Sequence, residues 1–478
     1  MKQFKWITLL LIVPMIISGC GGNKIADTGS APDTDADTDA DSDSDTDSDT
    51  DTDTDTDTDT DTDTDTDTDA DTDTNSHNDT DSSADTDTEN ATDVATESDS
   101  GTTPDDSDSE TESDTGMTAF CTLPSNRSDV AVQAAYELWK TTVITAEGAG
   151  DYLRVRKPDS GSVIDSTVSE GIGYGMLLAV YMDDQPLFDN LWLYEQRYLN
   201  DNGLMDWEIS PDGQVIGSGA ASDGDEDMAF ALVMASRKWG GQGLLPETYE
   251  AYAAELINAI FDHEVDVQRD FMLKAGDSWG NVDIANPSYF APAYYRVFAE
   301  VTGNNDWMKV VDSSYAIIER SLNAVSGNQD NGLVPAWCNS AGEPVEAYSG
   351  APLYFQHDST RTPFRVAQDY CYFGEPRAKA YLEKITSFYR EVGVPNIVDG
   401  YELDGTPRPS RAVNGEQAAS FVGPAGVGAM NAPGNQAFID EAWAAVASLE
   451  LTAGTIYYEK SWAALSLLMM NGDFIPLP

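Results

Sequence analysis

Three short stretches of the sequence place carboxylic acids where a helix is expected to begin. In residues 167–181, TVSEGIGYGMLLAVY, Glu170 precedes three alternating glycines and an apolar run. Glycine weakens the start of a helix, and an ionised carboxylate is costly against a hydrophobic core. The core alone therefore gives no reason for Glu170 to be there, and this residue is a candidate for chemistry.

The second stretch, residues 221–239, reads ASDGDEDMAFALVMASRKW and crowds Asp223, Asp225 and Asp227 into one helical turn. Acids are favoured at a helix N-terminus, so capping is the simplest explanation. Capping needs only one of the three, which leaves another free to face a polar ligand. A calcium loop is excluded, because Met228 occupies the position that requires glycine.

The third stretch, residues 355–370, reads FQHDSTRTPFRVAQDY. Asp358 and Arg361 stand three residues apart at a predicted loop-to-helix junction, and Pro363 fixes the first turn. The pair can be an ion pair that caps the helix or part of a site, and this stretch alone leaves both open.

The elements that position these acids are predicted to be helices, because apolar residues beyond position 118 recur mostly at helical spacing. The predicted ranges are 129–143, 170–184, 186–199, 224–239, 246–261, 287–303, 306–322, 360–373, 376–392, 414–422, 435–449 and 456–470. Ser128-Asp129, Pro246-Glu247 and Pro287 are the expected start signals.

Twelve helices in one domain of about 360 residues indicate six stacked hairpins. A superhelical array would show self-similarity at a fixed period, and none is visible. We therefore predict an all-α fold, a closed (α/α)6 barrel. In such a ring the loops at one end converge on a cleft, so polar residues at helix starts become the candidate site.

The first 20 residues, MKQFKWITLLLIVPMIISGC, carry two lysines, an apolar run and small residues before Cys20. This pattern predicts an export signal, and the ISGC ending resembles a bacterial lipoprotein signal in which the cysteine receives lipid. An ordinary cleaved signal with a chance cysteine is the alternative. We expect a lipid anchor at Cys20 that holds the protein at the bacterial cell envelope, on its surface or in the periplasm, with secretion as the other outcome.

Residues 21–117 are almost entirely Asp, Thr and Ser, with Asp-Thr alternation from about Ser48 to Asp69. They hold 36 acidic residues and one lysine, a charge of −35 out of −60 for the chain. So few apolar side chains cannot offset the entropy of ordering, which predicts a disordered, extended linker. A calcium-binding role would need the glycine and glutamate of an EF-hand loop, and the Asp-Thr tract has neither.

Residues 118–478 form the predicted catalytic domain, with 49 acidic and 22 basic residues and a net charge of −27. That charge excludes nucleic acid as a partner. Three cysteines, Cys121, Cys338 and Cys371, cannot all pair internally, and the sequence does not choose among them. No Cys/His spacing indicates a metal site. We expect a monomer without metal or cofactor.

Together the three acidic stretches resemble glycoside hydrolase family 8, the inverting β-glycanases with an (α/α)6 barrel. SEGIGYGMLLAVY is similar to the family's Ser-Glu-Gly-x-Gly-Tyr-Gly segment, and ASDGDEDMAFALVMASRKW to its Ala-Ser/Thr-Asp-Gly/Ala-Asp signature. GLMDWEI, NPSYFAPAYYRVFA, VDGYELDG and YYEKSWAALSLL follow in the family's order. The resemblance spans residues from about 140 to 475.

The resemblance implies that Glu170 is the general acid and Asp358 the base that activates water, with Arg361 orienting the base. It implies that Asp223 binds sugar hydroxyls at the cleavage site, with Asp225 as the competing candidate. A helix N-terminus would lower the pKa of Glu170, but burial and the charge of Asp223 would raise it. The glycines after Glu170 are expected to let the sugar approach the backbone.

Aromatic residues in the matching segments are expected to contact sugar. Trp207 and Tyr289 are the best candidates, and Tyr457 is placed near the water beside the base. Trp139, Trp239 and Trp462 lie on helical faces and are expected in the core. The sequence departs from the family at His357 and Phe364, where an aromatic residue and a tryptophan are usual, so the shape of the sugar subsites is in doubt.

The resemblance implies an endo-acting enzyme on β-1,4-linked polysaccharide, with cellulose-type β-glucan as first choice. The sequence RTPFR after Asp358 is more similar to the family's endoglucanases than to its xylanases. Xylan and chitosan remain alternatives, since an acidic domain tolerates a cationic polymer. A polysaccharide lyase is disfavoured by the charge of −27, and an inactive glycan-binding surface lipoprotein is the remaining alternative.

Overall fold

The computed structural model describes residues 120–159, 163–280, 282–409, 417–452 and 457–478. The predicted signal segment with Cys20 and the predicted linker 21–117 lie outside the described residues. The described part is mainly α-helical. Its helices are α1 (Asp129–Val143), α2 (Ser169–Tyr181), α3 (Gln185–Glu195), α4 (Ser222–Lys238), α5 (Tyr249–Glu264), α6 (Pro292–Thr302), α7 (Trp307–Ser321), α8 (Arg361–Phe373), α9 (Pro376–Val392), α10 (Ala419–Ala429), α11 (Gln436–Ala447) and α12 (Tyr457–Asn471).

Short antiparallel strands and 3-10 turns connect these helices. The strands are β1 (Ile144–Thr145), β2 (Arg154–Val155), β3 (Thr167–Val168), β4 (Glu208–Ile209), β5 (Val215–Gly217), β6 (Val265–Asp266) and β7 (Met272–Leu273), paired as β1–β2, β3–β4–β5 and β6–β7. The 3-10 turns are η1 (Asp277–Trp279), η2 (Pro287–Tyr289), η3 (Val394–Asn396), η4 (Pro433–Asn435) and η5 (Glu450–Thr452). Strand β3 leads directly into α2, and this connection sets where Glu170 lies.

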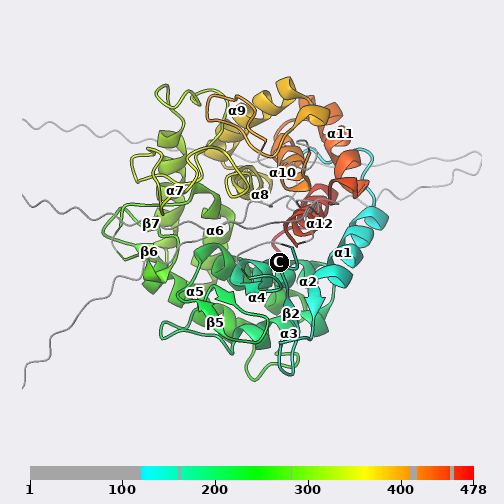
Figure 1. Ribbon diagram of the computed structural model, residues 1–478, viewed down its shortest axis with the longest axis vertical. Helices are drawn as coiled ribbons and strands as arrows, with labels where there is room; N and C mark the ends of the chain where they lie inside the picture. The colour runs from blue at the N-terminus through cyan, green and yellow to red at the C-terminus, as the bar shows by residue number, and fades with distance from the viewer. Residues whose placement is uncertain (1–119, 160–162, 281, 410–416, 453–456) are drawn as a thin grey trace, which may run out of the picture. The chain divides into compact units, whose positions relative to one another are not determined.

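The helices are arranged as a ring of pairs (Figure 1). The even-numbered helices contact one another in order, from α2 through α4, α6, α8 and α10 to α12, and α12 contacts α2. Each odd-numbered helix packs against one of them: α3 on α2, α5 on α4, α7 on α6, α9 on α8, α11 on α10 and α1 on α12. Figure 1 shows the odd-numbered helices on the outer side of the even-numbered ones.

The inner helices α2 and α4 are buried around most of their circumference. Every residue from Gly171 to Val180 in α2 is buried, and so is every residue from Ser222 to Ala235 in α4. The buried part of α2 is apolar, as expected of a helix in the interior of a domain, whereas α4 also buries several acids near its start. No helix among the described residues is long and apolar enough to cross a membrane.

Glycines bring α2 and α4 into close contact. A Cβ atom added at Gly173 would lie 2.8 Å from the Cβ atom of Asp227, and one at Gly224 would lie 2.8 Å from the backbone nitrogen of Glu170. Neither helix could hold a side chain at these positions without moving its neighbour. The sequence analysis assigned the glycines after Glu170 to sugar binding, but in the structure they make room for protein atoms.

Most predicted helices are confirmed to within a few residues, and two starts are corrected. Helix α5 begins at Tyr249 rather than at Pro246, because the side chain of Thr248 accepts a hydrogen bond from the backbone N–H of Ala251 and caps it. Pro287 opens the turn η2, and α6 begins only at Pro292.

The predicted helix 414–422 is wrong, because α10 begins later and runs through Pro424 to Ala429. Proline in a helix interior has no N–H to donate to the carbonyl four residues earlier. Here that carbonyl belongs to Ser420, and it accepts a hydrogen bond of 2.9 Å from the hydroxyl of Thr360 instead. A contact from a distant segment therefore satisfies the carbonyl that the proline leaves free.

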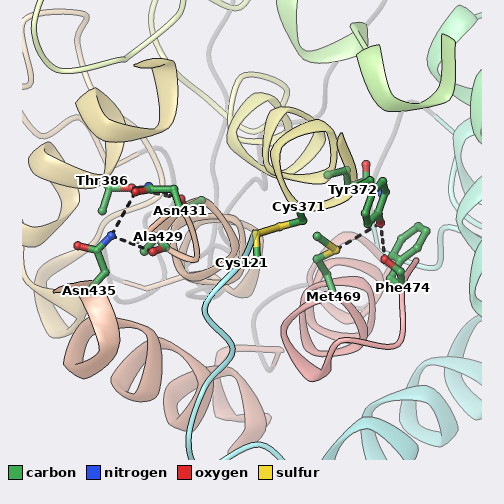
Figure 2. Close-up of a disulfide and its surroundings, with 11 residues drawn as sticks. Cys121, Cys371, Tyr372, Thr386, Ala429, Asn431, Asn435, Met469 and Phe474 are labelled. Atoms are coloured by element: carbon green, nitrogen blue, oxygen red, sulfur yellow. Dashed lines mark hydrogen bonds between the residues drawn. A yellow bond between two sulfur atoms is a disulfide. The ribbon is translucent and has the colours of Figure 1, made fainter. Parts of the chain in front are cut away.

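The disulfide joins Cys121 to Cys371, which resolves the pairing that the sequence left open. Figure 2 shows that this bond ties the segment before α1 to the last turn of α8. The third cysteine, Cys338, is a buried free thiol.

Candidate active site

Helix α2 begins with Glu170 in its first turn, as the sequence predicts. The residue before it, Ser169, donates its backbone N–H to the carbonyl of Trp207 at 3.0 Å, next to strand β4. This contact extends the β3–β4 pairing to the helix start. The side chain of Glu170 is 19% exposed, so it lies at the boundary between the core and solvent.

Arg361, the first residue of α8, brings the acids from all three stretches together. Its Nη1 atom lies 2.7 Å from Glu170 Oε2 and 2.6 Å from Asp223 Oδ2, and its Nη2 atom lies 3.5 Å from Asp358 Oδ1. The arginine side chain is 1% exposed. A buried guanidinium needs carboxylate partners, and a planar fork of donors can hold several at fixed positions.

The acids near the start of α4 bind different partners. Asp223 binds Arg361, whereas Asp227 forms two hydrogen bonds of 3.0 and 3.1 Å with Arg365. Asp225 is fully buried and its carboxyl lies beside that of Glu264. The structure therefore brings Asp223 to Glu170 and places Asp225 in a different cluster.

Burial raises the pKa of Glu170 to about 7. Arg361 opposes this rise, the negative charge of Asp223 adds to it, and a hydrogen bond from Tyr457 opposes it. A carboxyl with a pKa near 7 can hold a proton near neutral pH and release it in a reaction. Burial and the charge of Asp223, the two causes predicted from the sequence to raise the pKa of Glu170, both raise it in the structure.

Asp358 lies just before α8 and is held by two groups. The amide of Gln356 donates to its Oδ2 atom at 2.9 Å, and Arg361 faces its Oδ1 atom. Burial raises the pKa of Asp358, while the charge of Arg361 and the hydrogen bond from Gln356 act against that rise by favouring the carboxylate. Gln356 was not singled out from the sequence.

Two of the aromatic candidates lie beside the acids. The hydroxyl of Tyr457, at the start of α12, donates a hydrogen bond of 2.7 Å to Glu170 Oε1, whereas the sequence analysis placed it near the base. The ring of Tyr289 lies 5.0 Å from the guanidinium of Arg361, and the residue is 2% exposed. Burial and then the charge of Asp223 raise the pKa of the Tyr289 hydroxyl, which places it among the acids.

The tryptophans singled out from the sequence differ in burial. Trp207 is half-buried and its ring covers Gly217, where an added Cβ atom would come within 2.3 Å of it. Trp139 and Trp462 are in the core as predicted, while Trp239 is only partly buried.

Sequence reasoning missed Trp279, which lies in η1 and is half-buried. Its ring stacks on that of Trp337 at 5.3 Å, and Trp337 in turn meets Tyr289 edge-on at 6.1 Å. An aromatic layer therefore leads outward from Arg361 and Tyr289. The loop sequence GDSWGN could have identified Trp279 as a candidate binding residue, because a tryptophan in a polar loop has no helical face that would bury it.

No group of three or more His, Cys, Asp or Glu side chains among the described residues is arranged to hold a metal ion. The acids of the site are instead bound by arginine, tyrosine and glutamine side chains. This arrangement places a carboxyl with a pKa of about 7, that of Glu170, and a second carboxyl, that of Asp358, against different nitrogens of one fixed positive charge.

Comparison with known proteins places the chain in a group of carbohydrate-active enzymes. Residues 114–472 match the model of the family described as glycosyl hydrolases family 8. The chain is 39% identical over 358 residues to Endoglucanase A of Acetivibrio thermocellus, covering 74% of this chain and 72% of that protein. It is 31% identical over 367 residues to the Beta-glucanase of Niallia circulans, covering 72% of this chain and 85% of that protein.

Solved structures show the same fold. The apo structure of a Beta-1,3-1,4-glucanase from Paenibacillus sp. X4 superimposes with a TM-score of 0.67 and 30% identity, covering 74% of this chain and 96% of that one. Rex8A of Paenibacillus barcinonensis, solved with xylose, superimposes with a TM-score of 0.61 at 22% identity, covering 73% of this chain and 94% of that one. At that identity the second likeness concerns the fold alone.

Proposed function

The chain belongs to family 8 of the glycosyl hydrolases, and we propose that it cleaves β-1,4-linked polysaccharide internally, with inversion at the anomeric carbon. The observation that carries this proposal is the buried guanidinium of Arg361, which contacts Glu170, Asp223 and Asp358 at once. We also propose that the helices form the closed (α/α)6 barrel predicted from the sequence and that this barrel holds the active site. The ring of contacts among the even-numbered helices supports this.

In this mechanism Glu170 is the general acid. Its pKa of about 7 lets it carry a proton to the glycosidic oxygen, so that the leaving sugar departs as an alcohol. Asp358 is the general base and takes a proton from the water that attacks the anomeric carbon from the opposite face. Asp223 has two proposed tasks: its charge raises the pKa of Glu170, and it binds a sugar hydroxyl through Oδ1, which also accepts from the backbone N–H of Gly224 at 3.0 Å.

Inversion requires the two carboxyls to be roughly 6.5–9.5 Å apart, because a water molecule must fit between the base and the sugar. Glu170 and Asp358 contact different nitrogens of one guanidinium, which supports a spacing wider than that of a directly paired carboxyl couple. Burial raises the pKa of Asp358, and the positive charge of Arg361 favours its ionised form against that rise.

The substrate that we propose is cellulose-type β-glucan. Endoglucanase A of Acetivibrio thermocellus, Endoglucanase 2 of Ruminiclostridium josui and Endoglucanase C of Ruminiclostridium cellulolyticum are 39%, 38% and 37% identical to this chain, which favours that substrate class over xylan. Half-buried Trp207 and Trp279 are proposed to stack on sugar rings of the substrate.

Reducing-sugar release and viscosity measured on carboxymethylcellulose, barley β-glucan, xylan and chitosan would test this function. We expect the highest rate on a β-glucan, with viscosity falling faster than reducing ends appear, and no activity of the Glu170→Gln variant on any polymer. Release of single sugars from chain ends as the sole product would refute internal cleavage. A preference for xylan or chitosan would refute the proposed substrate.

We also propose that the protein is exported, anchored by lipid at Cys20 and spaced from the envelope by residues 21–117. The support is the signal-like sequence ending in ISGC and the composition of the acidic segment. Fractionation of cells that express Cys20→Ser should find the protein in the soluble fraction. Retention of that variant with the membrane would refute the anchor.

A further inference from the structure

The carboxyl group of Glu170 is held by two donors with different chemistry. Oε2 accepts from Nη1 of Arg361 at 2.7 Å, and Oε1 accepts from the hydroxyl of Tyr457 at 2.7 Å. A guanidinium can only donate, whereas a tyrosine hydroxyl can donate or accept. A proton on Oε2 would lie beside a fixed positive charge, so the proton of the acid is favoured on Oε1.

The ring of Tyr457 packs against Gly171, and its hydroxyl lies next to Oε1 of Glu170. A Cβ atom added at Gly171 would lie 3.1 Å from Cε2 and 3.2 Å from the hydroxyl oxygen of Tyr457, so the ring lies directly against the backbone that follows Glu170. Tyr457 is 3% exposed, while the side chain of Glu170 is 19% exposed. The tyrosine therefore takes the buried side of Oε1, and the remaining position for a proton is on the open side.

We propose that Tyr457 is a positioning residue for the acid: it fixes the proton of Glu170 on the substrate side of Oε1 and stabilises the carboxylate that forms. During the step, the bond from Oε1 to hydrogen breaks and a bond from that hydrogen to the glycosidic oxygen forms. The bond from the anomeric carbon to that oxygen breaks, its electron pair stays with the oxygen, and the water that gives a proton to Asp358 bonds to the anomeric carbon. Glu170 is left as a carboxylate that accepts from Tyr457 and Arg361. The proposal rests on Glu170 being the acid.

The electrostatics of the site give this proposal a readout in the pH profile. Burial raises the pKa of Glu170 to about 7, and the hydrogen bond from Tyr457 acts in the opposite direction. Removing the hydroxyl therefore raises the pKa further. The alkaline limb of the kcat profile follows the loss of the proton from Glu170, so it must move to higher pH in Tyr457→Phe.

The neighbouring tyrosine provides a matched control. The hydroxyl of Tyr458 donates at 2.7 Å to the backbone carbonyl of His357 and not to the carboxyl of Glu170. Tyr458→Phe removes the same atom one residue away, and we expect the alkaline limb to stay where it is in the wild-type protein.

The experiment measures kcat against pH for Tyr457→Phe, Tyr458→Phe and Glu170→Gln, on barley β-glucan and on a dinitrophenyl β-cellotrioside. A hydrogen bond to a charged group is worth about 1.5–3 kcal/mol, so we expect Tyr457→Phe to lose about 10- to 100-fold in kcat on the polymer. The loss should be smaller on the aryl glycoside, whose leaving group departs without a proton. The alkaline limb of the kcat profile of Tyr457→Phe should move to higher pH.

Gly171→Ala is a second variant, and it removes no hydroxyl group from the protein. Its methyl group would press on the Tyr457 ring and move the hydroxyl away from Oε1, so its alkaline limb should shift in the same direction. An equal loss on both substrates with an unmoved alkaline limb in Tyr457→Phe and Gly171→Ala would overturn the proposal. Normal hydrolysis of the polymer by Glu170→Gln would instead overturn the role of Glu170 itself.

Discussion

At the scale of single residues, the site depends on which aspartate of α4 reaches Arg361. Asp223 and Asp225 are two residues apart on one helix, yet only Asp223 contacts the guanidinium, at 2.6 Å. Asp225 is turned toward Glu264, with neither of its oxygens bound by another donor among the described residues. The two side chains thus offer a matched pair for mutation.

We predict that Asp223→Asn lowers kcat on β-glucan by at least about tenfold, because a buried arginine loses a charged partner. The charge of Asp223 raises the pKa of Glu170, so its removal should lower that pKa and shift the alkaline limb to lower pH. Asp225→Asn should keep the wild-type rate and profile. Steady-state kinetics from pH 4 to 10 check this, and equal losses in both variants would contradict the site as described.

The sequence alone flagged Glu170, Asp223, Asp358 and Arg361, because charged residues at helix starts stand out against apolar periodicity. The family resemblance favours Asp223 over Asp225, but residue types and spacing alone could not choose between them, since their partners Arg361 and Glu264 lie elsewhere in the chain. The contact between Tyr457 and Glu170 spans 287 positions. No local pattern encodes such a contact, and only the closing of α12 onto α2 creates it.

At the scale of elements, the position of the acid depends on how closely α2 and α4 approach. A Cβ atom at Gly224 would lie 2.7 Å from the backbone carbon of Ser169 and 2.8 Å from the nitrogen of Glu170. Backbone atoms cannot rotate away as a flexible side chain can. One methyl group here must therefore move the first turn of α2.

We predict that Gly224→Ala lowers the free energy of unfolding by about 1–3 kcal/mol and lowers kcat as well, because overpacking shifts Glu170 away from Arg361. Gly434→Ala is the control, since a Cβ atom there meets nothing within 4 Å. Urea unfolding and kinetics on β-glucan measure both effects. A fully stable and active Gly224→Ala variant would show that the helix contact does not position the acid.

A second feature at this scale is a cluster of buried carboxyls shared by α3, α4 and α5. Glu195, Asp225 and Glu264 are fully buried, and the charge of Asp277 reaches Glu264. Burial raises the pKa of Glu264 from 4.5 to about 8 and that of Glu195 to about 8. Asp225 and Glu264 can share a hydrogen bond only if one of them is protonated.

These shifts make the folded protein bind protons that the unfolded chain has released. The stabilising contribution is complete below about pH 4.5 and is lost as the pH rises toward 8, at up to about 1.4 kcal/mol per pH unit for each group. In urea unfolding at several pH values, Glu264→Gln should weaken the fall of the unfolding free energy with rising pH. Glu250→Gln, which changes an exposed residue on the same helix, should leave that pH dependence unchanged. The same dependence of the unfolding free energy on pH in the wild-type protein and in Glu264→Gln would contradict the protonated cluster.

The helices themselves were largely predictable, because helical spacing of apolar residues survives even in buried elements. The error at α10 has a physical cause: Pro424 signals a helix end, but the hydroxyl of Thr360 satisfies the carbonyl that the proline leaves free. Likewise, the glycines of α2 are predicted from the sequence to make room for a sugar, whereas in the structure they make room for neighbouring protein atoms. Both errors concern contacts with distant segments.

At the scale of the whole molecule, the disulfide links the start of the described chain to the helix that begins with Arg361. Cys121 and Cys371 are 250 positions apart (Figure 2). The backbone N–H of Thr122 also binds the carbonyl of Met430 at 2.9 Å. A crosslink over so long a loop restricts the unfolded chain strongly.

We predict that replacing Cys121 and Cys371 together by serine lowers the free energy of unfolding by about 2–5 kcal/mol while the kcat on β-glucan stays near that of the wild-type protein. The bond lies at the last turn of α8, at the opposite end from Arg361. Thermal unfolding of oxidised and reduced protein measures the effect, with Cys338→Ser as the control for a cysteine outside the disulfide. An unchanged unfolding curve would show that the crosslink does not restrain the fold.

The central claim, that Glu170 and Asp358 act as acid and base on opposite faces of the sugar, is tested most directly by the configuration of the first product. Proton NMR of a fresh hydrolysate of a β-linked glucan, recorded before mutarotation, reports the anomer released by the enzyme. The account predicts the α-anomer first, because water activated by Asp358 attacks opposite the leaving group. An initial β-anomer would mean retention through a covalent intermediate and would contradict the role of Asp358 as base.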